Sequence, residues 1–441
     1  MNSKHNLVPP AHIAVRLVPA VSALLIIALL AGGSLTAEAA QTGRRAANFA
    51  VAHNAHANRA PLPVTAASFK RAGKPEPAAP PAPSDTVIDG QLGPGSLYRL
   101  VRPANWNGRL FLYAHGYVSK SEPVALPAEV NLFLSTLTSQ GVAVAFSSFS
   151  ENGWVVKDGA QRTHQLLGIF TSKFGQPARV YIGGASMGGL IAIKLVEQYP
   201  GAFAGALTAC PVAGGTKLQY DYFANTRVLF DFFYPGTLPG NAGDVPPGTD
   251  LTNAVVLPAL AAMQGSPAGA FAIASIDQTP APFSNPAELL ESIATALGAN
   301  AGSYSDLVPE LHGKPYFDNR NLQYTSGALP APLLAALNAN VGRFDAAPSA
   351  LNYMVKYYQP SGNLQIPMLM LSTWRDPVAP AFNQTAYLNL VTAAGHSDLL
   401  VQRSVSGTGN GYGHCTFTPT ELGTAFGDLV GWVDFGFKPA P

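Results

Sequence analysis

Residues 184–188 have the sequence Gly-Ala-Ser-Met-Gly, a G-x-S-x-G pattern that can present a serine hydroxyl for acyl transfer. The β-branched, apolar residues 180–182 before it predict a strand, and residues 190–196 after it predict a helix. A serine on so sharp a turn has a strained backbone, and its glycine neighbours let the strand and the helix approach closely. The hydroxyl of Ser186 is therefore expected to project from the edge of a sheet as a candidate nucleophile.

An aspartate and a histidine that could activate this serine follow later in the chain, each after a predicted strand. Asp376 comes after the apolar residues 366–371, and His414 lies in a glycine-rich loop after residues 399–405. Histidine, with a reference pKa of about 6.5, can accept the serine proton at neutral pH and return it to a leaving group. A buried carboxylate fixes the tautomer of the imidazole and stabilises its charged form. Because sites gather at the carboxyl ends of parallel strands, the three side chains are expected to converge there.

Each of these assignments has a structural alternative. Ser186 could be an ordinary turn serine, and Asp376 could cap a turn without a catalytic role. His396 is a second candidate base, but it precedes the last predicted strand and is therefore expected at the opposite edge of the sheet. His115 directly follows a strand and is expected to shape its loop.

In this order, each after its own strand, these motifs resemble the α/β-hydrolase superfamily. The resemblance covers residues 97–435. It rests on four motifs, which are His115-Gly116, the pattern of residues 184–188, Asp376-Pro377-Val378 and His414. The resemblance implies that Ser186 is the nucleophile, that His414 is the general base and then the acid, and that Asp376 orients the imidazole.

The same resemblance implies two backbone N–H groups that stabilise the oxyanion of a tetrahedral intermediate. Met187, directly after the nucleophile, is expected to supply one of them. Tyr117, in the loop after the His115-Gly116 motif, is expected to supply the other, although its ring could instead line the substrate pocket. Loss of one such donor typically raises the barrier by about 3–4 kcal/mol.

The chain has two cysteines, Cys210 and Cys415. Cys415 follows the candidate base, and Cys210 ends the strand after the serine turn, so both are expected at the catalytic edge. In an exported protein two cysteines most simply form one disulfide, which here would pin the histidine loop. Two unpaired buried thiols are the alternative. The tannase-like branch of the superfamily pairs its post-histidine cysteine with one just before the serine; because that position is Ala185 here, its activity is not carried over.

The segments that must position these residues alternate between strand and helix patterns. Apolar runs predict strands at residues 97–102, 109–114, 142–146, 180–183, 205–209, 366–371 and 399–405. Helical spacing of apolar residues predicts helices at residues 128–139, 159–174, 190–199, 286–297, 333–337 and 418–433. Such alternation is typical of the α/β class, a mostly parallel sheet flanked by helices.

The alternation stops after residue 210 and resumes at residue 366. A structureless loop of that length is implausible in a compact domain. We therefore expect a mainly helical cap, residues 211–365, inserted after the sixth strand of a core formed by residues 85–210 and 366–441. Aromatic residues of this cap suit the wall of an apolar acyl or aromatic pocket, or equally the cap's own core. They are Tyr220, Tyr222, Phe223, Phe230, Phe232, Phe233 and Tyr234.

Residues 1–39 have the pattern of a secretory signal peptide, with Lys4 and Arg16 before the apolar residues 21–31 and a small-x-small cleavage site at residues 37–39. An uncleaved anchor is the alternative, but the apolar run is shorter than the about 20 residues of a spanning helix. Residues 40–84 are rich in Ala and Pro and are expected to form a flexible leader. The mature protein is expected in a periplasm or outside the cell, without a stable membrane span.

Charged residues make up 12% of the chain and the net charge is +1, so capture of nucleic acid or acidic lipid is not expected. No C-x-x-C or H-E-x-x-H pattern indicates a metal, and no cofactor is expected. The sequence therefore predicts an exported serine hydrolase that cleaves small-molecule or polymeric carboxylic esters through an acyl-enzyme. The alternatives are a prolyl-oligopeptidase-like peptidase or amidase, a polyester depolymerase, and a non-catalytic binding protein on the same scaffold.

Overall fold

The computed structural model describes residues 84–441, so the predicted signal peptide lies outside the described residues, as does the predicted leader except for its last residue. The described strands are β1 (Thr86–Gln91), β2 (Leu97–Arg102), β3 (Arg109–Ala114), β4 (Ala143–Ser147), β5 (Arg179–Ala185), β6 (Gly205–Ala209), β7 (Met368–Thr373) and β8 (Leu400–Val405). They form one sheet in the order β1-β2-β4-β3-β5-β6-β7-β8. The pairs β1–β2 and β2–β4 are antiparallel, and all the other pairs are parallel.

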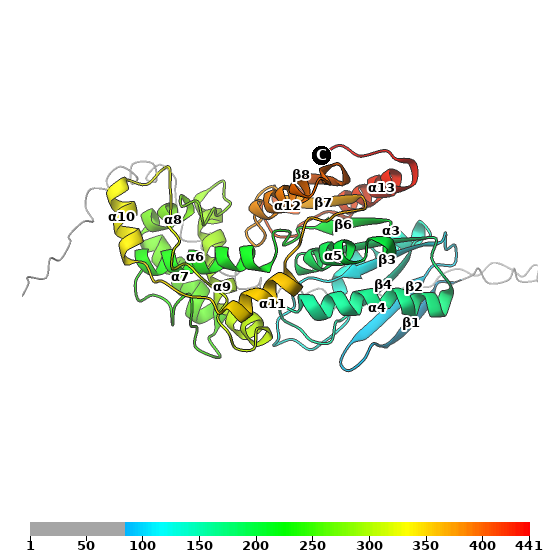
Figure 1. The fold of residues 1–441 in the computed structure, drawn as a ribbon, viewed down its shortest axis with the longest axis horizontal. Coiled ribbons are helices and arrows are strands. Elements are labelled where there is room, and N and C mark those ends of the chain that lie inside the picture. Colours follow the sequence, from blue (N-terminus) through cyan, green and yellow to red (C-terminus); the bar gives the residue numbers. More distant parts are fainter. Residues whose placement is uncertain (1–83) are drawn as a thin grey trace, which may run out of the picture.

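Helices cover both faces of this sheet, so the sheet separates the hydrophobic core into two parts (Figure 1). In β3, Leu110 and Leu112 point to one face, and Phe111 and Tyr113 point to the other, as the two-residue period of a strand requires. The first face is covered by α4 (Val156–Phe174), α5 (Met187–Gln198) and α12 (Phe382–Ala393). The second is covered by η1 (Ala128–Leu132), α3 (Leu134–Ser139) and α13 (Pro419–Phe435). The predicted α/β class, with a mostly parallel sheet flanked by helices, is confirmed.

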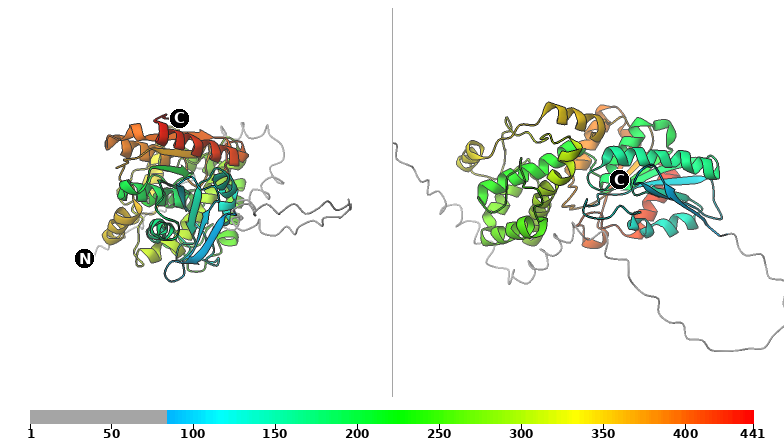
Figure 2. Two further views of the ribbon diagram at one scale, coloured as in Figure 1. Left: turned by 90° about the vertical axis from the view of Figure 1, so that its right-hand side faces the viewer. Right: turned by 90° about the horizontal axis from the view of Figure 1, so that it is seen from below.

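The segment between β6 and β7, residues 211–365, is called the insertion below. Its helices are α6 (Thr216–Phe233), the π-helical η3 (Leu251–Val256), α7 (Leu257–Gly265), α8 (Pro267–Ala274), α9 (Pro286–Glu310), α10 (Ala331–Asn340) and α11 (Pro348–Tyr358). They gather to one side of the sheet, as Figures 1 and 2 show. Within residues 84–441, no single helix is long and apolar enough to cross a membrane. One pair of segments, Leu251–Gly265 and Pro267–Ala274, reaches that length and composition when taken together, but the chain bends by 106° between them.

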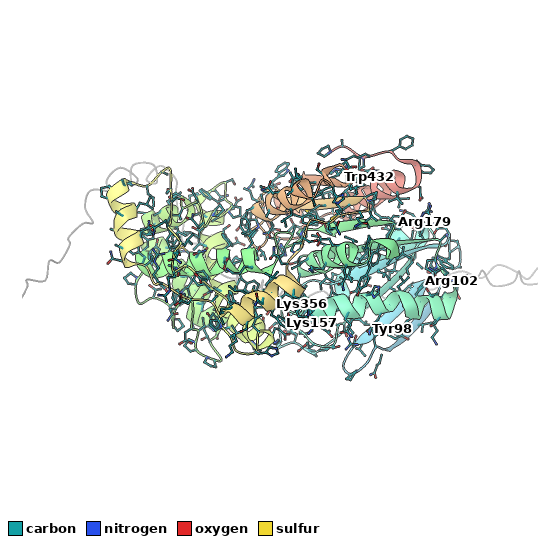
Figure 3. The ribbon with its side chains drawn as sticks, viewed as in Figure 1. Tyr98, Arg102, Lys157, Arg179, Lys356 and Trp432 are labelled. Carbon is teal, nitrogen blue, oxygen red and sulfur yellow. A yellow bond between two sulfur atoms is a disulfide. The ribbon has the colours of Figure 1, made fainter. Side chains whose placement is uncertain are left out.

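The last helix of the insertion returns to the core by packing on α4. Lys157 of α4 lies over the ring of Tyr357 of α11, 4.4 Å from its centroid, and Lys356 lies 4.9 Å from the same ring. Figure 3 shows the two lysines close together where these helices meet. Contacts between a cation and an aromatic ring contribute about 0.5–1 kcal/mol at exposed sites, so this junction helps to fix the insertion on the core.

The predicted helix over residues 128–139 is wrong in one respect, because η1 ends and α3 begins on either side of Phe133. Phe133 leaves the helical backbone with φ −130° and ψ −10°. Its ring packs edge-on against the rings of Phe111 and Tyr113 in β3, with centroids 6.1 and 5.0 Å away. This contact with the sheet takes precedence over the local helical pattern.

Helix α9 and strand β1 also differ from the sequence-based expectation. Helix α9 continues to Glu310 instead of ending near residue 297. Its second half contains Asn300, Ser303 and Asp306, which are buried although they are polar, so the apolar period does not reveal the helix there. Strand β1 is not predicted at all, because it is a largely exposed edge strand without a buried apolar face.

Strand β5 and helix α5 approach each other closely at the turn that joins them. A Cβ atom on Gly184 would lie 2.8 Å from the Ala114 carbonyl oxygen and would overlap the Gly188 carbonyl group. A Cβ atom on Gly188 would lie 2.5 Å from the His115 carbonyl oxygen. Glycine at both positions therefore permits the close strand–helix contact that the sequence predicts.

Replacing Gly184 by alanine should lower the free energy of unfolding by about 1–3 kcal/mol, because the added methyl group overlaps backbone that cannot move alone. Gly168→Ala is the matched control, since a Cβ atom there, in the exposed middle of α4, meets no atom within 4 Å. The control should raise the free energy of unfolding by about 0.5–1 kcal/mol. Urea denaturation of both variants measures these changes, and a shift of the same sign in both would contradict the packing described here.

Candidate active site

Ser186 occupies the turn between β5 and α5 in a backbone conformation that few residues other than glycine adopt. Its φ is 56° and its ψ is −121°. Its N–H donates to the Ala209 carbonyl oxygen of β6 at 2.9 Å, and its own carbonyl accepts from the Gly189 N–H at 3.0 Å. Conformations of this kind cost about 1–3 kcal/mol and persist where the surroundings fix them, which these hydrogen bonds do here.

Three side chains from three loops form one hydrogen-bonded row at this turn. The distance from Ser186 Oγ to His414 Nε2 is 2.8 Å, and that from His414 Nδ1 to Asp376 Oδ2 is 2.8 Å. Asp376 is 2% exposed and Ser186 is 8% exposed, so the row is almost closed to solvent. Because a carboxylate only accepts hydrogen bonds, the proton of the neutral imidazole lies on Nδ1, which leaves Nε2 to accept from the serine hydroxyl.

Backbone groups hold the aspartate in place. Asp376 Oδ1 accepts hydrogen bonds from the N–H groups of Val378 at 2.8 Å and Ala379 at 2.9 Å. These bonds orient the carboxylate, and they leave Oδ2 directed at the imidazole. The residue therefore caps its own turn and also contacts His414.

The histidine loop, residues 406–418, is joined to the end of β7 by hydrogen bonds in both directions. Arg375 N–H donates to the Gly411 carbonyl at 2.6 Å, and Gly413 N–H donates to the Arg375 carbonyl at 3.1 Å. Thr373 Oγ1 also donates to the Gly413 carbonyl at 2.6 Å. The loops that carry Asp376 and His414 thus form one unit, which sets the distance between the two side chains.

The two other candidate histidines lie outside the row. His396 directly precedes η4 (Ser397–Leu399), ahead of β8, and so lies at the sheet edge away from Ser186. His115 stacks on Phe149 with ring centroids 3.8 Å apart. It follows β3 and is buried, in keeping with the loop-shaping role expected for it.

Met187 and Tyr117, the two expected oxyanion donors, lie in segments that adjoin Ser186. Met187 is the first residue of α5, so its N–H has no partner within the helix. The loop after β3 passes directly beside the serine, since a Cβ atom on Gly116 would lie 3.4 Å from the Ser186 Cβ. Tyr117 comes next, and its N–H donates to no protein acceptor within residues 84–441.

The side chain of Tyr117 connects this loop to the insertion. Its hydroxyl donates a hydrogen bond to the carboxylate of Asp306 in α9, and the residue Asp306 is only 3% exposed. Burial raises the pKa of Asp306, and the hydrogen bond from Tyr117 offsets only part of that shift. No motif in the sequence singles out Asp306, because it lies in a stretch of small residues without an apolar period.

A second connection runs from the insertion to the histidine loop through Arg375. Its guanidinium donates to the Glu288 carboxylate of α9 at 3.0 Å and to the Asn410 carbonyl at 3.0 Å. Burial disfavours the charged form of Glu288, but hydrogen bonds from Arg375 and Ser284 outweigh it and lower the pKa of Glu288. Arg375 precedes Asp376, yet the sequence shows no sign of this role because its partner lies 87 positions away.

Cys210 and Cys415 form a disulfide between the end of β6 and the histidine loop. Their Cα atoms are 5.4 Å apart, although the residues are separated by 205 positions in the sequence. Together with His414 they make the one candidate cluster of metal-ligand atoms within the described part of the chain. Because a disulfide removes both thiolates, these residues cannot bind a metal in this state.

Two cavities meet at Ser186 and His414. The large cavity, of about 500 Å³, is lined by apolar residues of the second sheet face, including Phe111, Leu137, Leu207, Phe417, Leu422 and Phe426. The small cavity, of about 180 Å³, lies against the insertion. Of the aromatic residues considered from the sequence, Tyr220 and Phe223 line the small cavity. Both also belong to the hydrophobic core, as do Tyr222, Phe230 and Tyr234.

Removing the disulfide by Cys210→Ser with Cys415→Ser should lower the free energy of unfolding by about 2–5 kcal/mol, because the bond closes a long loop in the unfolded chain. Urea denaturation of the double variant measures this loss, and reduced wild-type protein should unfold like the variant. Intact mass after alkylation, with and without prior reduction, is the check on the bond itself. Two alkylated thiols in unreduced native protein would contradict the structure.

Asp306→Asn should change how stability depends on pH. The folded-state pKa of Asp306 lies above its unfolded value of about 3.9, so its contribution is fully present below that pH and is lost as the pH rises through the folded pKa. Asparagine keeps an acceptor for Tyr117 but does not titrate. The Tm of the variant minus that of the wild type should therefore become more positive from about pH 4 to about pH 8. The exposed Asp398→Asn is the control, and a difference independent of pH would contradict the burial effect.

No protein-family model matches the chain, and no curated protein matches it. Among solved structures, an esterase from Aspergillus oryzae has a TM-score of 0.43 and 14% identity, over 80% of this chain and 80% of that one. Feruloyl esterase B from Aspergillus oryzae has a TM-score of 0.43 and 15% identity, over 80% of each chain. Brefeldin A esterase, described as a bacterial homologue of human hormone-sensitive lipase, has a TM-score of 0.38 and 13% identity, over 90% of this chain and 83% of that one.

The fold follows from the chain's own topology. The sheet is antiparallel at its β1 edge and parallel elsewhere, and helices cover both of its faces. The strand–turn–helix around Ser186 lies between β5 and α5, in the interior of the sheet order. Residues 84–441 adopt the α/β-hydrolase fold.

Proposed function

We propose that this protein is a serine hydrolase that cleaves carboxylic esters through an acyl-enzyme. The observation that carries the proposal is the buried row in which His414 lies 2.8 Å from both the Ser186 hydroxyl oxygen and an Asp376 carboxylate oxygen. A serine hydroxyl is a weak nucleophile until a base removes its proton during attack, and this row supplies such a base together with the group that orients it.

Acylation follows from this geometry. Ser186 Oγ attacks the ester carbonyl carbon, and its proton moves to His414 Nε2. The charge that develops on the carbonyl oxygen is stabilised by the N–H groups of Met187 and Tyr117, which remain proposed donors. The bond between the acyl carbon and the alcohol oxygen then breaks, and His414 returns the proton to that oxygen. Asp376 stabilises the imidazolium throughout without accepting the proton.

Deacylation repeats these steps with water in place of the serine hydroxyl. His414 removes a proton from water, the resulting hydroxide attacks the acyl carbon, and the proton returns to Ser186 Oγ as the acid leaves. The alcohol must depart first, because water has to reach the same imidazole. The serine ends the cycle in its original state, so no net change of the protein and no further reactant is needed.

Two features favour esters over amides of charged peptides. Charged residues make up 12% of the chain, and the walls of the large cavity are mainly apolar, which suits uncharged substrates. The buried carboxylate of the small cavity, Asp306, is already engaged by Tyr117 and is therefore a poor anchor for a substrate amino group. The peptidase and the polyester depolymerase remain outcomes that a substrate panel can distinguish.

We also propose that the protein is exported to a periplasm or the extracellular medium. The signal-peptide pattern of residues 1–39 supports export, and the Cys210–Cys415 disulfide is compatible with an oxidising compartment.

A fluorophosphonate probe should label the wild type and fail to label Ser186→Ala, because the probe reacts only with an activated serine. Asp376→Asn should keep the fold but lower kcat by about 10⁴-fold, since it disturbs the histidine tautomer. Ser172→Ala, an exposed serine on α4, is the control and should label like the wild type. Equal labelling of Ser186→Ala, or no labelling of the folded wild type, would favour a non-catalytic binding protein.

Comparison of kcat/KM on p-nitrophenyl acyl esters and on aminoacyl anilides separates the ester hydrolase from the peptidase. We expect the ratio of the ester rate to the anilide rate to be larger with the protein than in buffer alone. The rates in buffer measure the intrinsic reactivity of the two substrates. Faster anilide cleavage after that correction would overturn the ester assignment while leaving the catalytic row intact.

A further inference from the structure

The large cavity reaches Ser186 from the sheet face that the insertion does not cover. Its floor is formed by Phe111 and Tyr113 of β3 and Leu207 of β6. One wall is η1 with α3, and the other is the histidine loop with α13. The cavity therefore runs between two helices of the core, from the serine toward the surface.

The two helices that flank this cavity approach each other where α13 carries a glycine. Gly423 of α13 faces Thr136 of α3, and a Cβ atom on Gly423 would lie 3.8 Å from the Thr136 Cγ2, an ordinary van der Waals distance. At the far end, Asn131, Leu132 and Gln140 are exposed to solvent, with Leu132 at 59% exposure. The large cavity thus extends from Ser186 to exposed residues, so an unbranched chain attached to Ser186 could lie along it.

The chemistry of the large cavity suits hydrocarbon. Apart from the catalytic row, most of its lining side chains are apolar, and Glu129 is the one carboxylate among them. Glu129 lies 3.5 Å from the Tyr113 hydroxyl. The volume of the large cavity, about 500 Å³, is within the range of about 300–1,000 Å³ that ligand pockets occupy.

The small cavity differs from the large one mainly in size, at about 180 Å³. Its walls are also mainly apolar, but they carry hydrogen-bonding groups of Gln219, Thr252, Thr295, Ser303 and Asp306 beside Tyr117. Such groups can hold a small hydroxylated group, and they can hold the water that deacylation needs once that group has left.

We infer that the large cavity binds the acyl chain and the small cavity binds the alcohol, so that the substrates are esters of long, apolar carboxylic acids with small hydroxylated alcohols. The inference rests on the proposed ester hydrolysis. The order of the reaction supports it, since the acyl group stays bonded to Ser186 while water replaces the alcohol. With the acyl chain in the large cavity, departure of the alcohol leaves the small cavity open to that water.

Two ester series test this assignment with the full-length mature protein. In the first series the acyl chain grows from acetate to dodecanoate on p-nitrophenol, and in the second the alcohol grows from ethanol to octanol on acetate. Gly423→Leu places a side chain in the large cavity beside Thr136. Gly427→Leu is its control, one turn further along the same helix, where a Cβ atom meets nothing within 4 Å. Ala299→Leu narrows the small cavity from α9.

For the wild type, kcat/KM should rise by up to about fourfold for each methylene of the acyl series. Gly423→Leu should lower kcat/KM for octanoate and longer esters by about tenfold or more and leave acetate within about twofold, while Gly427→Leu matches the wild type. Ala299→Leu should affect the alcohol series instead. Should Gly423→Leu fail to fold, Thr136→Leu on the opposite wall repeats the test.

Three outcomes would count against the inference, and they can be told apart. If Gly423→Leu impairs the alcohol series and Ala299→Leu the acyl series, the two cavities are assigned the wrong way round. If Gly423→Leu changes neither series, the large cavity does not bind substrate. If the wild type hydrolyses no ester and its Ser186→Ala variant behaves identically, the proposed function itself fails.

Discussion

The backbone turn at Ser186 is the constraint on which the rest of the site depends. The non-glycine residues with positive φ angles at this edge of the sheet include Ser186 at 56°, Cys210 at 43° and Cys415 at 55°. Such conformations are unfavourable alone, so each must be held by its neighbours. Ser186 is held by hydrogen bonds to β6 and α5 and by the glycines that let strand and helix meet, while the two cysteines hold each other covalently.

The parallel strands explain how distant residues meet at this turn. Ser186 and His414 are 228 positions apart, yet they follow β5 and β8, whose carboxyl ends lie at the same edge of the sheet. The disulfide then joins the end of β6 to the histidine loop. Two contacts from α9, Asp306 with Tyr117 and Glu288 with Arg375, connect the insertion to the loops on either side of the serine. The position of the insertion and the geometry of the row are therefore physically coupled.

The sequence was sufficient to predict those features that depend on local patterns and on the order of strands. The turn at Ser186, the strand-end positions of Asp376 and His414, and the proximity of Cys210 to Cys415 all follow from apolar periods and glycines. The sequence was not sufficient to predict contacts between distant elements, because those contacts depend on how the elements pack in the folded chain. Asp306 belongs to the half of α9 that lacks an apolar period, Glu288 pairs with a residue 87 positions away, and Gly423 approaches Thr136 only because α13 and α3 face each other there.

The most direct test of the central claim, that Ser186 is the activated nucleophile of this row, is a crystal structure of the protein inactivated with an octyl phosphonate ester. We expect a bond from phosphorus to Ser186 Oγ, and a phosphoryl oxygen at about 2.7–3.1 Å from the N–H groups of Met187 and Tyr117. We also expect His414 Nε2 to remain within hydrogen-bond distance of the adduct. Phosphorus bonded to another residue, or an adduct on Ser186 whose oxygen points away from both N–H groups, would contradict this role of Ser186.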